Sequence, residues 1–230
     1  MRAAARGTQR ERTMIQAAIF DMDGLMFDTE PLWYKAWTPA LARFGLTLDD
    51  TLADECRGTS GAVRDAVISR HFPGYDVHAI TQALDGEAAQ IIAREMTKKP
   101  GLDELLAWLD AASVPCVVAS SSSHEMIRGN LERTGVAQYF RAAVSGRDVE
   151  HGKPAPDVFL AAAAAVGAEP SRSLVLEDSF AGVRAGHAGG FVTVMVPDLM
   201  QPTEEIATLA DAVCGSLLDV RDLLAAGELE

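Results

Sequence analysis

Two aspartates separated by a single residue follow the first apolar segment of the chain. The stretch "AAIFDMDG" runs from Ala17 to Gly24 and places Asp21 and Asp23 directly after the apolar run. An acid at such a place is often a turn former or a helix cap, and that simpler interpretation suffices for Asp21 alone. Two like charges so close together repel each other, however, so the pair needs a counter-ion. The spacing therefore indicates a site that holds a cation.

Three further groups of polar residues stand at the edges of expected strands and helices. Ser120 opens the run "SSSS", Lys153 lies in "GKPAPD", and Glu177 and Asp178 end "SLVLED". Each has a simpler interpretation as a loop serine, a solvated lysine or acids near a helix N-terminus. Those interpretations do not predict all the groups together, in this order, at strand ends. We expect the groups to converge, since ligands of parallel sheets bind at the carboxyl ends of the strands.

Converging there, these groups would supply up to four carboxylates, one ammonium and one hydroxyl. Hard oxygen ligands in this number suit a hard divalent cation, and a small set of protein ligands completed by water suits Mg²⁺ better than Ca²⁺. The sequence offers no cluster of histidine and cysteine with the spacing of a softer metal site. Mg²⁺ is thus the expected cofactor and the counter-ion of the acid pair.

Short apolar runs alternate with helical patterns over most of the chain, which indicates a parallel sheet covered by helices on both faces. The expected strands are 17–21, 115–120, 142–146, 173–178 and 191–196. The expected helices between and after them are 102–112, 124–135, 156–167 and 180–190. The fold class is therefore α/β, with a Rossmann-like parallel sheet as its core.

Residues from about 30 to 98 break this alternation, because three helical patterns (31–45, 61–72 and 78–99) follow one another with no strand between them. We expect an inserted all-helical cap domain over residues 30–96, which leaves and rejoins the sheet at the carboxyl end of the first strand. The α/β core domain then comprises residues 14–29 and 97–230. The arginine-rich segment 1–13 lacks the apolar stretch of a secretory signal, and we expect a disordered basic tail there.

The composition argues against several classes of partner. The 230 residues are 48% hydrophobic and 23% charged, with a formal net charge of −13. This acidic balance argues against nucleic acid and anionic membranes as partners, and no apolar run is long enough to span a bilayer. Three scattered cysteines, Cys56, Cys116 and Cys214, are typical of a cytoplasmic protein with buried, inert thiols. We expect a cytoplasmic monomer whose partner is a small molecule.

Four motifs together resemble those of the haloacid dehalogenase-like (HAD) hydrolase superfamily. They are "FDMDG", the apolar run into Ser120, "GKPAPD" and "LEDSFAG", in the order that the family shows. The resemblance covers nearly the whole chain from about Ala17 onward. The helical insert is similar to the cap of the family's phosphoglucomutase-like branch, which implies a small phosphorylated metabolite as substrate.

The resemblance implies a role for each acid. Asp21 would be the nucleophile that forms an aspartyl-phosphate, and Asp23 would be first the general acid and then the base. The metal would be held by the side chains of Asp21 and Asp178 and by the backbone carbonyl of Asp23. Glu177 would be a closer helper of the metal or a group behind its ligands. A carboxylate is a weak nucleophile towards an anionic phosphate, so such a site needs a metal and a lysine to lower the repulsion.

The remaining motif residues would bind the phosphoryl group. Ser120 and the backbone amide of Ser121 would bind phosphoryl oxygens, and Lys153 would neutralise both the nucleophile and the phosphate. We place Gly24 with them, because a glycine tolerates the backbone conformation in which the chain turns out of the strand toward the cap. A simple turn glycine is equally compatible with that position.

Within this family the sequence favours a phosphatase of sugar or polyol phosphates. Asp23 argues against the dehalogenases, which lack this second acid. Family mutases place a histidine where this chain has Trp33 and an arginine where it has Gly61, although Arg57 and Arg64 lie nearby. A β-phosphoglucomutase-type mutase remains the alternative. An alternative of another class is a phosphorylatable or phosphate-binding regulatory protein, although receiver domains of that kind are about half as long and lack a helical cap.

Two sets of residues outside the motifs leave their role open. Trp33, Trp37 and Phe44 on the first helix of the insert could line a substrate pocket, but the helical spacing of the two tryptophans favours core packing. His124 opens the helix after the serine run, where substrate contact and surface exposure are equally compatible with the sequence.

Overall fold

The computed structural model describes residues 15–57, 59 and 61–229. The predicted basic tail, residues 1–13, lies outside the described residues. None of the described helices is both long enough and apolar enough to cross a bilayer.

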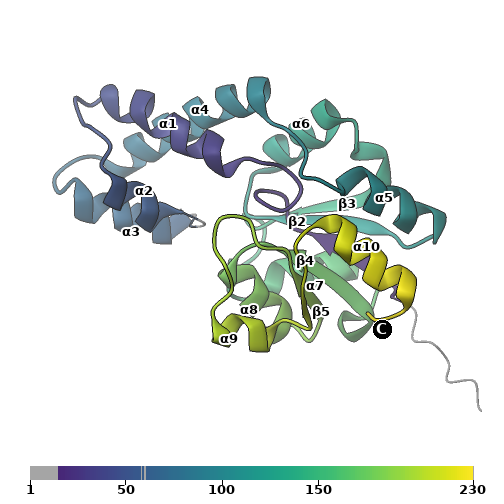
Figure 1. Cartoon of the computed structure of the whole chain (residues 1–230). Coiled ribbons are helices and arrows are strands. Elements are labelled where there is room, and N and C mark those ends of the chain that lie inside the picture. Colours follow the sequence, from purple (N-terminus) through teal and green to yellow (C-terminus); the bar gives the residue numbers. More distant parts are fainter. Residues whose placement is uncertain (1–14, 58, 60, 230) are drawn as a thin grey trace, which may run out of the picture.

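A parallel sheet forms the centre of the α/β part of the chain (Figure 1). All neighbouring strands in it run parallel. The five predicted strands are all present with ends shifted by one or two residues, whereas the short β6 was not predicted. The predicted α/β parallel fold is thereby confirmed. In spatial order the strands are β3 (Phe140–Ser145), β2 (Cys116–Ser120), β1 (Ala17–Phe20), β4 (Ser173–Glu177), β5 (Val192–Met195) and β6 (Ala212–Val213).

Successive residues of the central strands point to opposite faces of this sheet, and both faces are buried. In β1, Phe20 belongs to the hydrophobic cluster on one face and Ile19 to the cluster on the other. In β2, Val118 and Val117 divide in the same way. Burial on both faces explains why these strands appear in the sequence as continuous apolar runs.

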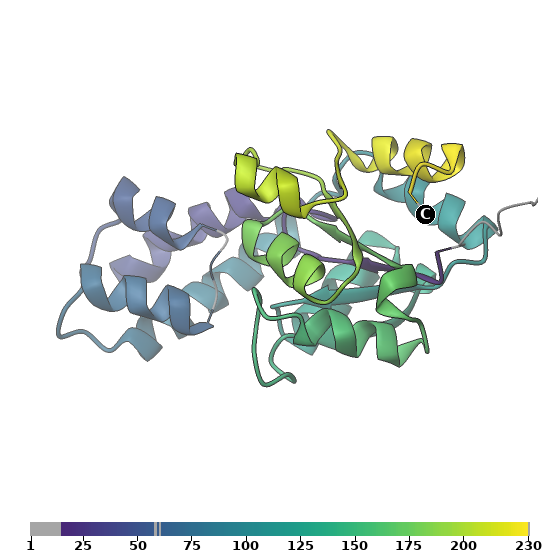
Figure 2. The same cartoon turned by 90° about the horizontal axis from the view of Figure 1, so that it is seen from below.

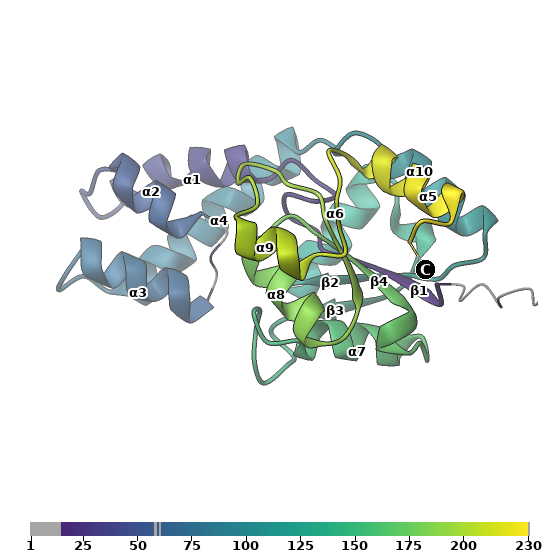
Figure 3. The ribbon, with the colours of Figure 1, turned by 60° about the horizontal axis from the view of Figure 1, so that its bottom comes forward.

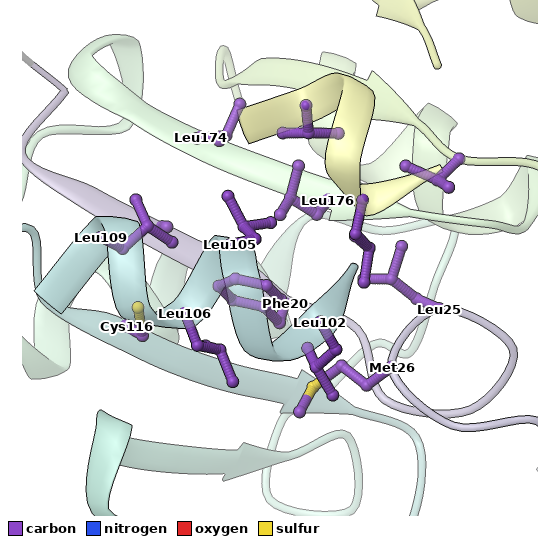
Figure 4. Packing of buried hydrophobic residues seen from close by; sticks show 14 of the residues in the cluster. Phe20, Leu25, Met26, Leu102, Leu105, Leu106, Leu109, Cys116, Leu174 and Leu176 are labelled. Carbon is purple, nitrogen blue, oxygen red and sulfur yellow. The ribbon is translucent and has the colours of Figure 1, made fainter. Parts of the chain in front are cut away.

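Helices cover the two faces of the sheet, and Figure 3 shows the strands between the two layers. Figure 4 shows leucines of α5 packed over Phe20 on the first face. The first face carries α5 (Leu102–Ala111), α6 (His124–Thr134) and α10 (Leu217–Ala226). The second carries α7 (Asp157–Ala165) and α8 (Phe180–Ala188), and α9 (Glu204–Leu209) packs beside α8. Short 3₁₀ helices span Ala137–Tyr139 and Pro170–Arg172.

Four helices between β1 and α5 form a helical insert that lies to one side of the sheet (Figures 1 and 2). They share a hydrophobic cluster of their own, separate from the clusters on the sheet, and α1 packs along α4. Trp37 is buried in this cluster, and Trp33 and Phe44 pack against it, so core packing accounts for these aromatics. The helices are α1 (Glu30–Ala42), α2 (Asp50–Cys56), which was not predicted, α3 (Gly61–His71) and α4 (Val77–Glu95).

The two segments that connect the insert to the sheet run side by side. The Asp28 amide donates to the Thr97 carbonyl at 3.0 Å, and the Lys99 amide donates to the Met26 carbonyl at 2.8 Å. The Lys99 ammonium also lies 2.6 Å from Asp198 Oδ1, in the loop after β5. Backbone pairing and an ion pair thus fix where the insert leaves and rejoins the sheet.

Candidate active site

The site begins where β1 ends. The Asp21 amide still bonds to the Leu176 carbonyl of β4 at 3.0 Å, and the chain then turns out of the sheet. Gly24 makes this turn with a φ of +84°, a conformation that side-chain-bearing residues rarely adopt. A Cβ at Gly24 would also lie 2.3 Å from Asp178 Oδ2. A glycine is therefore required here both by the turn and by the close approach of the Asp178 carboxylate.

Lys153 lies at the centre of the predicted residues. Its ammonium donates to Asp21 Oδ1, to Glu177 Oε1 at 2.6 Å and to the Ala119 carbonyl at 3.3 Å. Its side chain is only 8% exposed and lies 4.7 Å from the centre of the Phe159 ring. The tertiary structure therefore brings the first, third and fourth motifs together around one buried ammonium.

Glu177 is fully occupied by hydrogen bonds. Its Oε1 accepts from Lys153, while its Oε2 accepts from the Asp178 amide at 3.0 Å and from the amide and hydroxyl of Ser179 at 2.8 and 2.9 Å. Gly182 of α8 lies against it, since a Cβ there would be 1.8 Å from Glu177 Oε1. In this arrangement Glu177 orients Lys153, and its direct role at a metal stays a prediction.

The serine run follows β2 and reaches the same place. Ser120 is buried, and its hydroxyl accepts a hydrogen bond from the Ser122 amide at 3.1 Å. Ser121 is exposed. The Ser122 hydroxyl donates to Asp23 Oδ2 at 2.9 Å, a contact that the sequence analysis did not predict. Four consecutive serines were the available signal, but a sequence pattern does not say which hydroxyl points at an acid.

Burial and mutual repulsion dominate the electrostatics of the acids. Burial raises the pKa of Asp21 to about 7, with Lys153 acting in the opposite direction and Glu177 adding to the rise. Burial, then Glu177 and Asp21, raise the pKa of Asp178 well above its usual value. Burial raises the pKa of Asp23, while the hydroxyls of Ser122 and Thr29 lower it. Burial opposes the charge of Lys153, yet Asp21 and Glu177 raise its pKa above the ordinary value. The site thus gathers more negative charge than one ammonium neutralises.

This excess of buried oxygen ligands fits a hard divalent cation. The carboxylate of Asp178 packs against the turn at Gly24. It therefore borders the same region as the side chain of Asp21 and the backbone that follows Asp21. Among the described residues, no three histidine, cysteine or acidic side chains form a ready-made metal cage. The family resemblance implies the carboxylates of Asp21 and Asp178 and the backbone carbonyl of Asp23 as donors, with Glu177 as a closer helper or a group behind them. A donor set of that kind leaves positions for water and substrate.

A small cavity of about 20 Å³ lies beside Asp178. The helical insert contributes Glu30 and Arg57 to its lining, and the loop after β5 contributes Asp198. Burial, then Asp23 and Asp198, raise the pKa of Glu30 to about 7. The insert therefore faces the carboxyl edge of the sheet at this point.

Other candidate residues are placed away from the acids or are already engaged. His124 is exposed and lies 2.5 Å from Asp148 Oδ2, and it lines a separate cavity of about 570 Å³ between α6 and β3. None of the predicted site residues lines that larger cavity. Arg64 pairs with Asp85 at 2.8 Å and lies over the Trp33 ring.

Comparisons with known proteins agree with the motifs. A sequence model of the family described as haloacid dehalogenase-like hydrolase matches residues 18–196. The chain is 31% identical to fructose-1-phosphate phosphatase YqaB of Escherichia coli (strain K12) over 179 residues, which cover 77% of this chain and 94% of that protein. It is 30% identical to hexitol phosphatase B of the same organism over 217 residues, which cover 91% and 97%.

A solved structure shares the fold as well. The structure of CbbY from Rhodobacter sphaeroides in complex with phosphate matches with a TM-score of 0.80 at 27% identity, covering 90% of this chain and 96% of that one. The family match and the relatives lead to one conclusion, with which the convergence of the motifs agrees: this chain belongs to the haloacid dehalogenase-like hydrolase family.

Proposed function

We propose that the protein is a Mg²⁺-dependent phosphatase that hydrolyses a small phosphomonoester through an aspartyl-phosphate on Asp21. The observation that carries this proposal is the buried Lys153 ammonium, which donates to the Asp21 carboxylate and lies 2.6 Å from Glu177. An anionic nucleophile can approach an anionic phosphate only where positive charge lowers the repulsion between them.

In the first half of the reaction a carboxylate oxygen of Asp21 forms a bond to phosphorus while the bond from phosphorus to the leaving oxygen breaks. Asp23 gives its proton to that oxygen, so the product leaves as an alcohol and Asp23 becomes a carboxylate. Lys153 stays beside Asp21 and offsets the negative charge on the transferring group. Acid assistance of this kind is typically worth about 10²–10⁴-fold.

In the second half water attacks phosphorus, and the bond between phosphorus and Asp21 breaks. Asp23 accepts a proton from this water and returns to its starting state, while Asp21 is released as a carboxylate. Ser120 and the backbone amide of Ser121 bind phosphoryl oxygens in both halves, as loop donors at the carboxyl end of β2.

The side chains of Asp21 and Asp178 and the backbone carbonyl of Asp23 are the residues that would hold Mg²⁺. When bound, the cation supplies positive charge that stabilises the transferring phosphoryl group. The raised pKa values of Asp21 and Asp178, which follow first from burial, support a need for that charge.

A sugar or polyol phosphate is the substrate class that we propose. Two relatives are named as phosphatases of fructose 1-phosphate and of hexitol phosphates, which supports this class. We further propose that the helical insert, residues 30–96, acts as a cap domain over a core of residues 14–29 and 97–230. The shared cavity bordered by Glu30, Arg57 and Asp178 supports a role of the insert in selecting the substrate.

We propose that this phosphatase works as a monomer in the cytoplasm. Cys56, Cys116 and Cys214 are free and buried, which supports a reducing compartment.

A mutase is the alternative within the family. A mutase needs a second phosphate site and slow hydrolysis of its aspartyl-phosphate. Trp33 and Gly61 stand where family mutases carry the histidine and arginine, and neither can donate a charge-assisted hydrogen bond. Arg64, one of two arginines that could substitute, is held by Asp85 and Trp33. These contacts favour hydrolysis over transfer.

A screen of phosphorylated metabolites with Mg²⁺ and with EDTA tests the proposal. We expect phosphate release from sugar or polyol phosphates with Mg²⁺ and its loss with EDTA; turnover indifferent to the chelator would refute the metal assignment. Asp21→Asn should abolish turnover with the fold intact, and near-native activity of this variant would refute the covalent route. A regulatory protein would be phosphorylated without turnover.

The mutase alternative has its own test. With β-glucose 1-phosphate and a trace of the bisphosphate, we expect inorganic phosphate in step with dephosphorylated product. Rapid formation of glucose 6-phosphate without phosphate release would favour the mutase and would direct attention to Arg57.

A further inference from the structure

The Ser122 hydroxyl makes a contact that the four-motif set does not include. It donates to Asp23 Oδ2 at 2.9 Å, across from the loop after β2 to the loop after β1. The other carboxylate oxygen, Asp23 Oδ1, is buried and, within the described part of the chain, accepts no hydrogen bond of ordinary geometry, although the buried Thr29 hydroxyl also acts on this carboxyl and lowers its pKa. The Ser122 hydroxyl is therefore well placed to set the orientation of the carboxyl group.

Ser122 is itself held from both sides of its backbone. Its amide donates to the buried Ser120 hydroxyl at 3.1 Å, and its carbonyl accepts from the buried Ser145 hydroxyl at 2.7 Å. The next residue, Ser123, caps α6 by accepting from the Met126 amide at 3.3 Å. A hydroxyl on such a fixed segment can orient its partner with little loss of freedom when the substrate binds.

From this geometry we infer that Ser122 is a positioning residue, which holds the Asp23 carboxyl toward the leaving oxygen and stabilises the carboxylate formed as its proton departs. The inference rests on the proposed role of Asp23 as general acid. As the Asp23 O–H bond breaks and the O–H bond of the leaving alcohol forms, the hydrogen bond from Ser122 becomes one to a charged acceptor. Hydrogen bonds to charged acceptors are stronger than those to neutral ones, so this bond gains strength in the transition state.

Leaving groups of different quality separate this role from phosphate binding. An alkyl phosphate found in the screen needs a proton on its leaving oxygen, whereas the phenolate of 2,4-dinitrophenyl phosphate departs without one. We expect Ser122→Ala to lower kcat/KM for the alkyl phosphate by about 10- to 100-fold, the range for a lost hydrogen bond to a charged group. For the dinitrophenyl ester we expect a change below about twofold, and Ser122→Thr, which keeps the hydroxyl, should restore the alkyl activity.

Two comparisons complete the experiment. Ser123→Ala makes the same chemical change one residue away, where the hydroxyl caps α6, and we expect it to lower stability without any dependence on the leaving group. In an Asp23→Asn background, Ser122→Ala should have no further effect, because the group that it positions is gone. Urea unfolding of each variant confirms that the fold is intact.

Three outcomes would overturn the inference. These are an equal loss for both leaving groups, a rise in KM alone, and unchanged activity toward the alkyl phosphate; the first two would assign Ser122 to substrate binding. If Asp23→Asn itself slows both esters equally, the general-acid role of Asp23 is wrong and the proposed mechanism fails first. A selective loss in Asp23→Asn with a uniform loss in Ser122→Ala would refute the role of Ser122 alone.

Discussion

Replacement of Gly182 by alanine is expected to displace the carboxylate that orients Lys153. A Cβ at Gly182 would lie 1.8 Å from both Cδ and Oε1 of Glu177, far inside van der Waals contact. Glu177 cannot retreat without losing its bond to Lys153 at 2.6 Å and the bonds that its other oxygen accepts. Gly86 in α4 provides a matched control, because a Cβ there would meet nothing within 4 Å.

Both substitutions should gain stability from replacing a helical glycine, but only Gly182→Ala should lose stability by displacing Glu177. Alanine in place of a helical glycine stabilises by roughly 0.5–1 kcal/mol. Removing one partner of a buried ion pair lowers the free energy of unfolding by about 3–5 kcal/mol, because the other charge stays buried without a counter-charge. We therefore expect Gly86→Ala to raise the free energy of unfolding slightly and Gly182→Ala to lower it by roughly 2–4 kcal/mol.

Urea unfolding of both variants beside the unmodified protein, at one pH and buffer, measures these differences. Phosphate release under saturating substrate measures the consequence for the site, where we expect Gly182→Ala to lose activity and Gly86→Ala to keep it. If Gly182→Ala proved as stable and as active as Gly86→Ala, the placement of Glu177 behind Lys153 would be wrong.

Three further outcomes follow from burial and from the connection to the insert. Burial raises the pKa values of Cys56, Cys116 and Cys214 to about 11, 12 and 11, so Ellman's reagent at pH 8 should find no fast-reacting thiol in the folded protein and three in urea; a fast thiol before unfolding would contradict this. Burial raises the pKa of Glu30 from 4.5 to about 7, so the folded state binds more protons than the unfolded state in this window and the free energy of unfolding falls as pH rises through it. Glu30→Gln should make that fall less steep, while the raised pKa of Asp21 sustains part of it, and should be more stable than the unmodified protein at pH 8. Urea titrations at several pH values that show parallel curves for the two proteins would disprove this. The insert should close over the site about the paired segments near residues 25–30 and 96–101, so X-ray scattering should show a more compact particle with a transition-state analogue than without; identical profiles would indicate a static insert.

Much of the fold could be predicted because its elements carry local signals. Apolar runs bounded by turn residues marked β1 to β5, and helical periodicity marked most of the helices that cover them. Local signals failed where an element was short, as with the two residues of β6 and the seven of α2. They also misplaced strand ends, since Asp21 and Asp178 were expected inside strands that end at Phe20 and Glu177. Glu177 stays in β4 although it is an acid, because Lys153 and the backbone that begins α8 hydrogen-bond both of its oxygens.

The sequence by itself determined which chemical groups the candidate site contains, because the proposed nucleophile, the lysine and the other acids each lie in a motif of a few adjacent residues. The tertiary structure decided how those groups are used. Lys153 meets Asp21 across 132 positions of sequence, and Ser122 meets Asp23 across 99, so no local pattern records either contact. Glu177 meets Lys153 across 24 positions, whereas its contacts with Asp178 and Ser179 are local. Such roles depend on which loops the parallel sheet places side by side, and that order is a property of the folded chain.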